Sequence, residues 1–425
     1  MKHLSRGSDV HAGSSRKTLL FISHDASRTG APICLLHLLR WLKENTEYQF
    51  EILLRNPGPM HEDFSQCGPV TVFRHNVSIA HLLTQHGFRR GMKKWVRFWL
   101  EYVRGVFRHP SGMNEYGLVR HVQRCRPALI YSNTVVNGDL LRILFPLGCP
   151  IISHIHELRN IIEQFGPENW SSVSECTGQF IAASPAVKKN LVDNYGVNPN
   201  KVAVVYEFVP AKSYAKSYST NLSLRFELNI GESDFVVCGS GLDEWRKGVD
   251  LFIRCAYEVK KQTEQLVVFV WVGGWLSEQA RQAHVDLVAQ LGVEDRVQFT
   301  GMVENPLDYF AISDAFALTS REDAFPLVCL EAASLGKPVL CFADSGGMPD
   351  FVENDAGFVV PFGDYVTLAE RITRLARDKS LCRALGARAM EKVAERHDIG
   401  IGAPQVLAII RSVLKEHGVG GSSLQ

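Results

Sequence analysis

Short apolar runs alternate with helix-length segments along most of this chain. Strands that alternate with helices predict a parallel sheet with both faces covered. The apolar runs, rich in Val, Ile, Leu and Phe, fall into two sets: residues 18–22, 50–54, 70–73, 128–131, 151–154, 179–182 and 202–205, then residues 235–238, 267–272, 297–299, 315–318, 338–342 and 357–360. The sequence therefore predicts two doubly wound α/β domains of similar size.

The alternation breaks once, in a polar, Ser-rich stretch between residues 207 and 234 that we interpret as a linker region. With 425 residues, two domains are also the natural expectation from length. We expect a disordered tail over residues 1–16, an N-terminal Rossmann-like domain over 17–207, a linker region over 208–233, a C-terminal Rossmann-like domain over 234–395, a helical segment over 396–417 that packs back on the N-terminal domain, and a tail over 418–425.

Charge and cysteine usage exclude several classes of function. The formal net charge is +1, so nothing global favours binding to nucleic acid. The ten cysteines occur singly and form no C-x-x-C pair, which argues against a zinc or redox motif. The N-terminal residues lack the apolar region of a signal peptide, and no apolar run is long enough to span a bilayer. We therefore expect a cytoplasmic protein.

The segment SREDAFPLVCLEAASLGKPVLCF, residues 320–342, carries two spaced carboxylates. Asp323 lies in a loop after a predicted strand, and Glu331 lies in a helix that should begin about Pro326. Sugar hydroxyls suit carboxylate acceptors, and a diphosphate suits the N–H groups of a helix N-terminus. Taken alone, Asp323 capping the helix and Glu331 in a salt bridge would explain the pattern as well.

Two further loops follow predicted strands, where ligands bind in such sheets. Arg246 and Lys247 provide adjacent positive charges suited to a diphosphate, although a solvated surface role is the default for an isolated pair. Thr29 and Gly30 join the first strand to a helix, and a glycine there permits close approach of a ligand. A plain strand-to-helix turn remains the alternative for this loop.

Together these segments resemble the retaining GT-B glycosyltransferases of group 1, family 4. The E-x7-E element of that family, E-G-F-G-L-V-x-L-E-A-M-A-x-G-x-P-V, matches D-A-F-P-L-V-C-L-E-A-A-S-L-G-K-P-V from Asp323 to Val339. The resemblance implies a GT-B fold, in which two Rossmann-like domains face each other across a cleft. It also implies that Asp323 binds hydroxyls of the donor sugar, that Glu331 binds the ribose diol, and that the amides of Leu327 and Val328 meet the phosphate or sugar.

The same resemblance implies roles for the other loops. Lys247 matches the lysine of the family pattern G-R-x(4–5)-K-G, but Gly241 stands in place of its arginine, so Arg246 is the expected substitute. Thr29 and Gly30 partly match a Gly-Gly-Ala loop that faces the donor phosphate.

A family histidine near the donor sugar corresponds to His156 rather than His154, and Asn133 is a weaker candidate for a contact in the cleft. Contacts with the nucleotide base are expected from backbone at Gly301 to Glu304.

A basic and aromatic segment, residues 88–108, would form an amphipathic helix with Trp95 and Trp99 on one stripe. Arg90, Lys94 and Arg97 lie on another. Basic residues opposite aromatic ones are typical of a helix at the surface of anionic lipid. A helix packed on the core with a solvated basic face is equally compatible, so peripheral membrane contact and an acceptor-side role for this segment stay hypotheses.

The resemblance implies a retaining transfer of a sugar from a nucleoside-diphosphate sugar to an acceptor hydroxyl, in polysaccharide, glycolipid or glycoconjugate biosynthesis. It implies a saccharide or lipid-linked acceptor, no bound metal and no other cofactor. One alternative stays open. The departures at Gly241 and Asp323 are compatible with a non-catalytic homologue that binds a sugar nucleotide or a partner protein. A dinucleotide oxidoreductase would need the third glycine that Gly239-x-Gly241 lacks.

Overall fold

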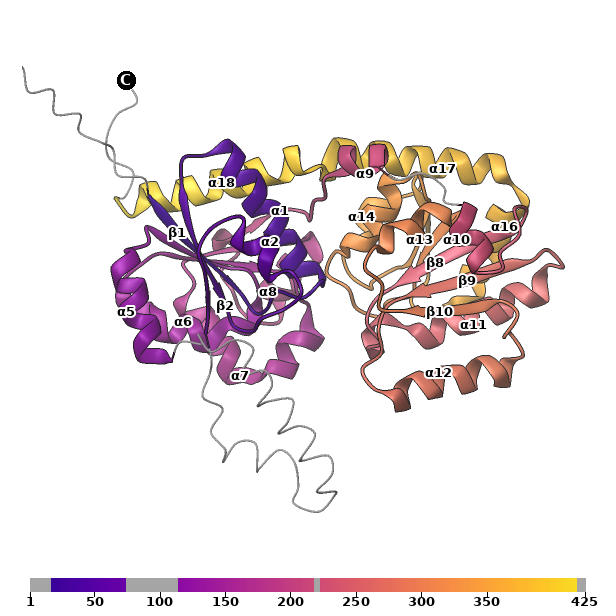
Figure 1. Ribbon diagram of the computed structural model, residues 1–425, viewed down its shortest axis with the longest axis horizontal. Helices are drawn as coiled ribbons and strands as arrows, with labels where there is room; N and C mark the ends of the chain where they lie inside the picture. The colour runs from indigo at the N-terminus through magenta and orange to yellow at the C-terminus, as the bar shows by residue number, and fades with distance from the viewer. Residues whose placement is uncertain (1–16, 74–113, 218–221, 419–425) are drawn as a thin grey trace, which may run out of the picture.

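The computed structural model describes residues 17–73, 114–217 and 222–418. These residues form two parallel sheets of seven and six strands, each covered by helices on both faces, and the two sheets lie side by side in Figure 1. The prediction of two doubly wound α/β halves is therefore confirmed. The basic and aromatic segment with Arg90, Lys94, Trp95, Arg97 and Trp99 lies outside the described residues.

The N-terminal sheet has the strand order β3-β2-β1-β4-β5-β6-β7. Its strands are almost fully buried, as a sheet covered on both faces requires. They are β1 (Thr18–Ser23), β2 (Gln49–Leu54), β3 (Val70–Val72), β4 (Leu129–Ser132), β5 (Ile151–Ile155), β6 (Gln179–Ala182) and β7 (Val202–Val204). The helices of this half are α1 (Gly30–Asn45), α2 (His61–Ser65), α5 (Glu115–Cys125), α6 (Gly138–Leu144), α7 (Arg159–Cys176) and α8 (Pro185–Asp193).

The C-terminal sheet has the strand order β10-β9-β8-β11-β12-β13. Its strands are β8 (Phe235–Ser240), β9 (Val267–Val272), β10 (Val297–Gly301), β11 (Ala315–Leu318), β12 (Val339–Phe342) and β13 (Gly357–Val360). Its helices are α11 (Val249–Gln262), α12 (Glu278–Leu291), α13 (Pro306–Ile312), α14 (Leu327–Ser334), α15 (Met348–Val352), α16 (Tyr365–Arg377) and α17 (Lys379–Lys392). Asp364 caps α16 by accepting a hydrogen bond from the Thr367 N–H.

The segment interpreted as a linker region contains two short helices, α9 (Ala211–Ser217) and α10 (Leu222–Glu227). Helix α9 packs on α14 and α10 packs on α13, so the segment lies on the C-terminal half and is not an open tether. A second crossing runs beside it, because Val209 forms a parallel bridge with Asp398. From there α18 (Ile399–Glu416) runs back along α1 of the N-terminal half (Figure 1).

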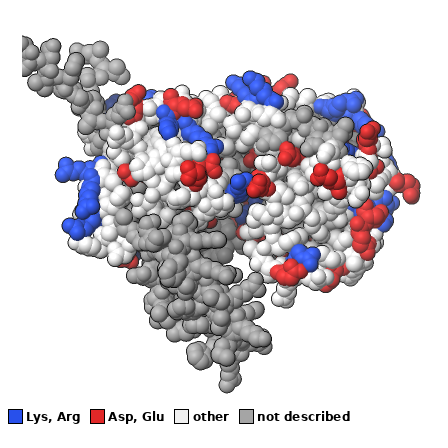
Figure 2. Space-filling view, viewed as in Figure 1, with Lys and Arg blue, Asp and Glu red and all other residues white. Residues whose placement is uncertain are grey.

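The carboxyl ends of the strands set the place of the site. In both halves the loops that carry the predicted residues follow β1, β5, β8, β10 and β11, at the carboxyl edge of a parallel sheet. Basic and acidic side chains are interspersed on the face seen in Figure 2, in keeping with the balanced net charge. No helix in the described ranges is long and apolar enough to cross a membrane.

Candidate active site

Asp323 and Lys247 form an ion pair at the carboxyl edge of the C-terminal sheet. Asp323 lies in the loop after β11, and its Oδ2 accepts hydrogen bonds from Lys247 Nζ at 2.5 Å and Ser320 Oγ at 3.2 Å. Lys247 closes a 3-10 turn (Trp245–Lys247) after β8. Both side chains are mostly buried, with 13% of Lys247 and 10% of Asp323 exposed. The ammonium group of Lys247 is therefore fixed in position by the Asp323 carboxylate.

The backbone of Asp323 is held by a neighbouring glycine turn. The Asp323 N–H donates to the carbonyl of Ser345 at 2.7 Å, and Asp323 pairs with Gly346 in an isolated bridge. Gly346 has φ of 141°, and a Cβ there would lie 1.6 Å from the carbonyl oxygen of Asp323. Gly346 is thus required by close backbone approach, and its role is to hold the acidic loop in place.

Glu331 lies within α14, one helical turn beyond its start. The helix begins at Leu327, with Pro326 as its N-cap residue and no side-chain cap. The first-turn N–H groups, which include those of Leu327 and Val328, have no acceptor within the helix. Glu331 is 6% exposed, and burial raises its pKa to about 7. A buried carboxyl group and free amide donors therefore share one end of α14.

His156 lies just beyond β5, at the carboxyl edge of the N-terminal sheet. Its Nδ1 is hydrogen-bonded to the Glu207 carboxylate, and its Nε2 lies 3.1 Å from Asn133 Oδ1. Burial lowers the pKa of His156, but the charge and hydrogen bond of Glu207 outweigh it and the net shift is upward. An acceptor at each nitrogen favours the protonated form of the ring.

The Asn133 amide links His156 to the first loop. Its Nδ2 donates to the carbonyl of Ala31 at 2.6 Å, which turns Oδ1 toward His156. Ala31 directly follows Gly30 in the first turn of α1. The position of His156 is therefore tied to the loop that carries Thr29 and Gly30.

His154 occupies a different environment inside β5. It is 1% exposed, and its Nδ1 lies 2.7 Å from the hydroxyl of Tyr131. The rings of His154 and His156 have centroids 4.0 Å apart and are tilted at 42° to each other. Burial, aided by the positive charge of His156, lowers the pKa of His154 well below its usual range, so His154 is neutral. Of the two histidines, His156 is the one at the cleft.

Gly30 is a glycine that the fold itself does not require. It is exposed at the start of α1, its φ lies outside the left-handed region, and a Cβ there would meet nothing within 4 Å. The neighbouring Thr29 hydroxyl lies 2.8 Å from Ser27 Oγ and does not cap α1. Open space in front of an uncapped helix N-terminus is suited to an anionic ligand.

The two halves meet around a small cavity of about 50 Å³ between these loops. Its lining combines His156, Glu157, Leu158 and Ile161 from the N-terminal half with Arg246, Glu322, Asp323 and Ala324 from the C-terminal half. The structure thus brings together His156, Arg246 and Asp323, which the sequence singled out separately.

Three hydrogen bonds also join the halves at this level. Glu322 accepts from the Asn160 N–H at 2.9 Å, the Ser184 hydroxyl donates to the carbonyl of Ala324 at 2.9 Å, and Arg28 Nη1 donates to the carbonyl of Glu304 at 2.8 Å. The two halves are therefore in direct contact around the cavity.

Two families of known proteins match the chain in tandem. Residues 30–212 match the family described as Glycosyltransferase Family 4, and residues 221–392 match the family described as Glycosyl transferases group 1. The chain belongs to the group 1 glycosyltransferases of GT-B fold. The predicted resemblance to the group 1 glycosyltransferases of GT-B fold is confirmed.

Curated relatives match this glycosyltransferase over part of their length. The N-acetyl-alpha-D-glucosaminyl L-malate synthase of Bacillus anthracis is 30% identical over 203 residues, which is 47% of this chain and 51% of that protein. The lipopolysaccharide core biosynthesis glycosyltransferase LpsD of Rhizobium meliloti is 34% identical over 175 residues, which is 40% of this chain and 48% of that protein. The matched region spans about half the length of these relatives.

Solved structures show the same fold over almost the whole chain. Anabaena HepE in complex with UDP-glucose superposes with a TM-score of 0.75 at 21% identity, covering 93% of this chain and 99% of HepE. WaaG, a glycosyltransferase involved in lipopolysaccharide biosynthesis, gives a TM-score of 0.67 at 14% identity and covers 92% of this chain and 99% of WaaG. At these identities the likeness establishes the GT-B fold.

Some predicted residues of the glycosyltransferase lie apart from the cavity. Gly301 ends β10 with φ of 71° and accepts a hydrogen bond from the Gly273 N–H at 3.1 Å. It does not line the cavity. Arg246 does line it, with Nε 2.5 Å from Glu244 Oε2, so the expected substitute for the family arginine already has an acidic neighbour.

Sequence reasoning missed the Glu207 partner of His156. The signal was a charged residue in a row of apolar ones, since Val205 and Phe208 on either side are buried. A carboxylate placed in such a row needs a buried partner. The contact of Glu322 with the start of α7 was missed as well, because it joins residues 162 positions apart.

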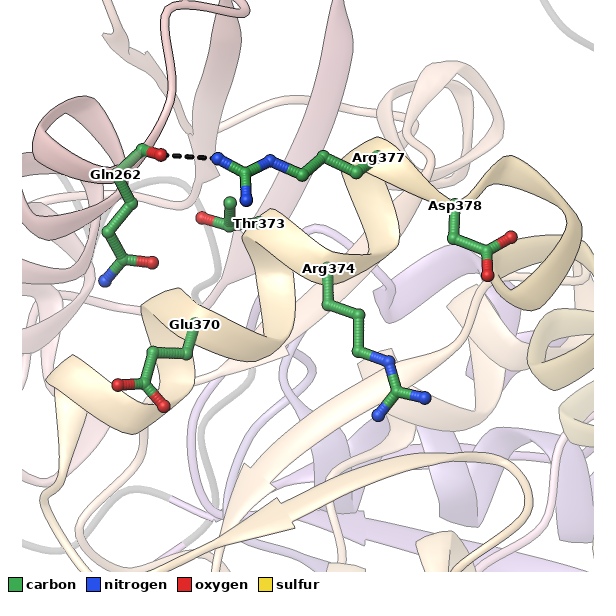
Figure 3. Close-up of a pocket in the computed structure, with 6 residues that line it drawn as sticks. All are labelled: Gln262, Glu370, Thr373, Arg374, Arg377 and Asp378. Carbon is green, nitrogen blue, oxygen red and sulfur yellow. Dashed lines mark hydrogen bonds between the residues drawn. The ribbon is translucent and has the colours of Figure 1, made fainter.

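A larger cavity of about 530 Å³ lies elsewhere on the C-terminal half, between the end of α11 and α16 (Figure 3). It is lined by Gln262, Glu370, Thr373, Arg374, Arg377 and Asp378. Arg377 is held by the carbonyl of Gln262 at 2.6 Å, and Arg374 points away from Arg377. None of the predicted site residues lines this cavity, so the smaller one marks the candidate active site.

Proposed function

We propose that this glycosyltransferase moves a sugar from a nucleoside-diphosphate sugar to an acceptor hydroxyl with retention at the anomeric carbon. The observation that carries the proposal is the arrangement of two walls. Lys247, Asp323 and Glu331 stand at the carboxyl edge of one sheet, and His156 and Gly30 stand at the carboxyl edge of the other. A donor bound between them would meet a cation, carboxylate acceptors and open amides at once.

The C-terminal wall would bind the nucleotide and the leaving group. Lys247 is a fixed positive charge for the diphosphate, and such charges are worth most where water is excluded. The uncapped start of α14, with the amides of Leu327 and Val328, adds donors for phosphate or sugar oxygens. Asp323 would accept from sugar hydroxyls, and Glu331 would accept from the ribose diol.

The N-terminal wall would place the donor sugar. Gly30 leaves room for the phosphate to approach the start of α1. His156 presents an imidazolium held from both sides, so its charge and orientation are set before the donor arrives. Preorganised charge of this kind stabilises a developing negative charge without reorganisation during the reaction.

The proposal needs no metal at the diphosphate. Lys247, Arg246 and the helix N-terminus supply the positive charge that a divalent ion would otherwise provide. UDP is the first nucleotide to test, because HepE, at 21% identity, was solved with UDP-glucose. The nucleotide base and the sugar remain to be assigned by binding.

We further propose a saccharide or lipid-linked acceptor in glycoconjugate or polysaccharide biosynthesis, and a place at the cytoplasmic face of the membrane. LpsD and WaaG, both named for lipopolysaccharide synthesis, support this acceptor class. Residues 88–108 would provide the membrane contact. Co-sedimentation with anionic vesicles at low salt tests this part, and absence of binding there excludes it.

Calorimetric titration with UDP, GDP and ADP, in chelator and then with Mg²⁺, tests the donor site. We expect one nucleotide to bind without metal, and its sugar conjugate to be hydrolysed slowly to a product of unchanged anomeric configuration by NMR. Inversion would disprove the retaining mechanism. Binding without any turnover, across a panel of sugar conjugates and acceptors, would favour the non-catalytic alternative.

A further inference from the structure

A second cluster of ionisable side chains lies at the opposite end of the N-terminal sheet. It comprises Glu51 on β2 and His121 and Cys125 on α5, whose ligand atoms all lie within 4.8 Å of one another. Glu51 is in the first half of its strand, and Cys125 is at the end of α5, just before β4 begins. The cluster is thus toward the amino edge of the sheet, whereas the proposed donor site is at the carboxyl edge.

Three different ligand atoms converge on one point in this cluster. His121 Nε2 is 3.4 Å from Cys125 Sγ and 3.4 Å from Glu51 Oε2. Ligands placed about 2.0–2.3 Å from a tetrahedral zinc ion lie about 3.4–3.7 Å from each other. The two distances from His121 Nε2 are therefore already close to those of a zinc site, and the thiol and the carboxylate oxygen lie within 4.8 Å of each other.

The arrangement differs from a nucleophilic triad. In a Cys-His-acid triad the thiol and the acid occupy opposite nitrogens of the ring. Here both the thiol and the carboxylate face the same nitrogen, Nε2 of His121. A relay of protons through the ring is not possible with this geometry, whereas joint coordination of one cation is.

The carboxylate of Glu51 has its partners within the cluster itself, the His121 ring and the Cys125 thiol. It sits on a strand between two others, with Phe50 and Ile52 buried on either side of it. Its Oε2 is buried and faces His121 Nε2 at 3.4 Å, and no Lys or Arg in the described part of the chain pairs with it. A largely buried carboxylate without a fixed positive charge beside it is costly, and a bound cation would supply that charge.

The cluster at Cys34, His156 and Glu207 also brings three such ligand atoms together. There, however, Glu207 is bonded to Nδ1 of His156 and Asn133 to its Nε2. All three side chains are deeply buried, whereas the side chain of His121 is 28% exposed and that of Glu51 19%. A metal ion can therefore reach Glu51, His121 and Cys125 without opening the core.

We propose that Glu51, His121 and Cys125 bind Zn²⁺, with a water molecule completing a tetrahedron. Thiolate, imidazole and carboxylate are the three ligand types that zinc accepts, and a helix presents residues four apart on one face. On binding, the Cys125 thiol loses its proton to solvent and the thiolate sulfur coordinates the ion. The ion would fasten the end of α5 to β2, a structural role apart from the metal-free donor site.

Alkylation of cysteines with and without Zn²⁺, read peptide by peptide in the mass spectrometer, tests this site in the full chain. We expect Zn²⁺ to slow alkylation of Cys125 at least about tenfold. Cys149 is a control in the same protein, because it too is a free, half-exposed thiol and has no place in the cluster. Its rate should not change.

Two variants, His121→Gln and Glu51→Gln, keep Cys125 and remove one ligand each. They should need more than about 100-fold more Zn²⁺ for the same protection, since even residues outside the coordination sphere account for 10–100-fold. Both should melt near the wild-type Tm in chelator, which shows that they fold. Equal protection of Cys125 in wild type and in both variants, or none in wild type, would overturn the proposal.

Discussion

The two walls of the cleft hold their charges in different ways. On the N-terminal wall, His156 is bonded at both nitrogens and shares a buried ion pair with Glu207. On the C-terminal wall, Lys247 has one carboxylate partner at the mouth of the cleft, and Glu331 is buried without a nearby positive charge to lower its pKa.

This difference suggests a division of labour. Groups whose hydrogen bonds are all made inside the protein cannot exchange them for a ligand at low cost, so they position it. Groups that are incompletely paired gain partners when a ligand arrives. We therefore expect substitutions on the C-terminal wall to act mainly on nucleotide binding and catalysis, and those at His156 and Glu207 to act mainly on stability and orientation.

The largest effect is expected from Lys247→Ala. It removes the positive charge proposed for the diphosphate leaving group and leaves Asp323 without its ion-pair partner. We expect kcat/KM to fall by about 10³-fold, in line with the loss of one preorganised group for transition-state charge. Lys260→Ala is the matched control, because Lys260 pairs with Asp295 on the surface. A decrease of less than about tenfold in Lys247→Ala would place the catalytic charge elsewhere.

Glu207→Gln tests the other wall. Removing one partner of a buried ion pair typically destabilises a protein by about 3–5 kcal/mol. The pKa of His156 is raised in the fold, so its pairing stabilises fully below the unfolded pKa of about 6.5 and is lost as pH rises through the folded value. The decrease in Tm should therefore be larger at pH 6 than at pH 9.

Glu163→Gln serves as the control for that variant. Glu163 pairs with Arg159 on the exposed face of α7, where 56% of its side chain is accessible. A surface pair of this kind should change stability by less than about 1 kcal/mol at either pH. Equal, small changes in both variants would contradict the view that the N-terminal wall is held by its buried ion pair.

The fold was predictable because its signal is local and repeated. The bounds of β6, β9, β11 and β13 coincide with the apolar runs, since buried parallel strands are continuous apolar segments. The helices α9 and α10 were not foreseen. They are only seven and six residues long, too short to show a helical period in the sequence, and packing of a few apolar residues such as Ala211 and Leu224 stabilises them.

The sequence predicted the individual residues of the candidate site but not which of them interact. Asp323, Lys247 and His156 each follow a strand, and a parallel sheet gathers such positions at one edge. Their partners come from far along the chain: Lys247 lies 76 residues from Asp323, and His156 lies 51 residues from Glu207. Only the fold brings these charges together, so the sequence could not reveal that Glu207 raises the pKa of His156.

Glu331→Gln should have opposite effects on stability and on binding. Burial raises the pKa of Glu331 from about 4.5 to about 7, so the folded state loses stability as pH rises between these values. The variant should therefore be more stable than wild type at pH 8, by up to about 3 kcal/mol, and equal to it near pH 4. Melting curves at the two pH values measure the difference.

Binding of UDP to Glu331→Gln should weaken by about tenfold at pH 8, as expected for the loss of a charged hydrogen-bond acceptor for the ribose diol. In wild type the affinity should rise as pH increases through about 7, because the carboxylate is the form that accepts both hydroxyls. If the variant binds UDP as tightly as wild type, Glu331 has only a structural role on the C-terminal wall.

The smallest effect on the fold is expected from Gly30→Ala. A Cβ at Gly30 meets open space and its backbone is not left-handed, so alanine should leave Tm unchanged or raise it, by less than about 1 kcal/mol in stability. The same Cβ would stand in front of the α1 amides, and we expect UDP-sugar affinity to fall by about tenfold.

Gly346→Ala gives the contrasting case. A Cβ there collides with the carbonyl oxygen of Asp323, so the variant should lose stability and activity together. Measurements of Tm and of activity therefore distinguish Gly30, which leaves room for the ligand, from Gly346, which the backbone requires. If donor affinity is unchanged in Gly30→Ala, the start of α1 does not contact the donor. His156 would then be the residue through which the N-terminal wall acts on the donor.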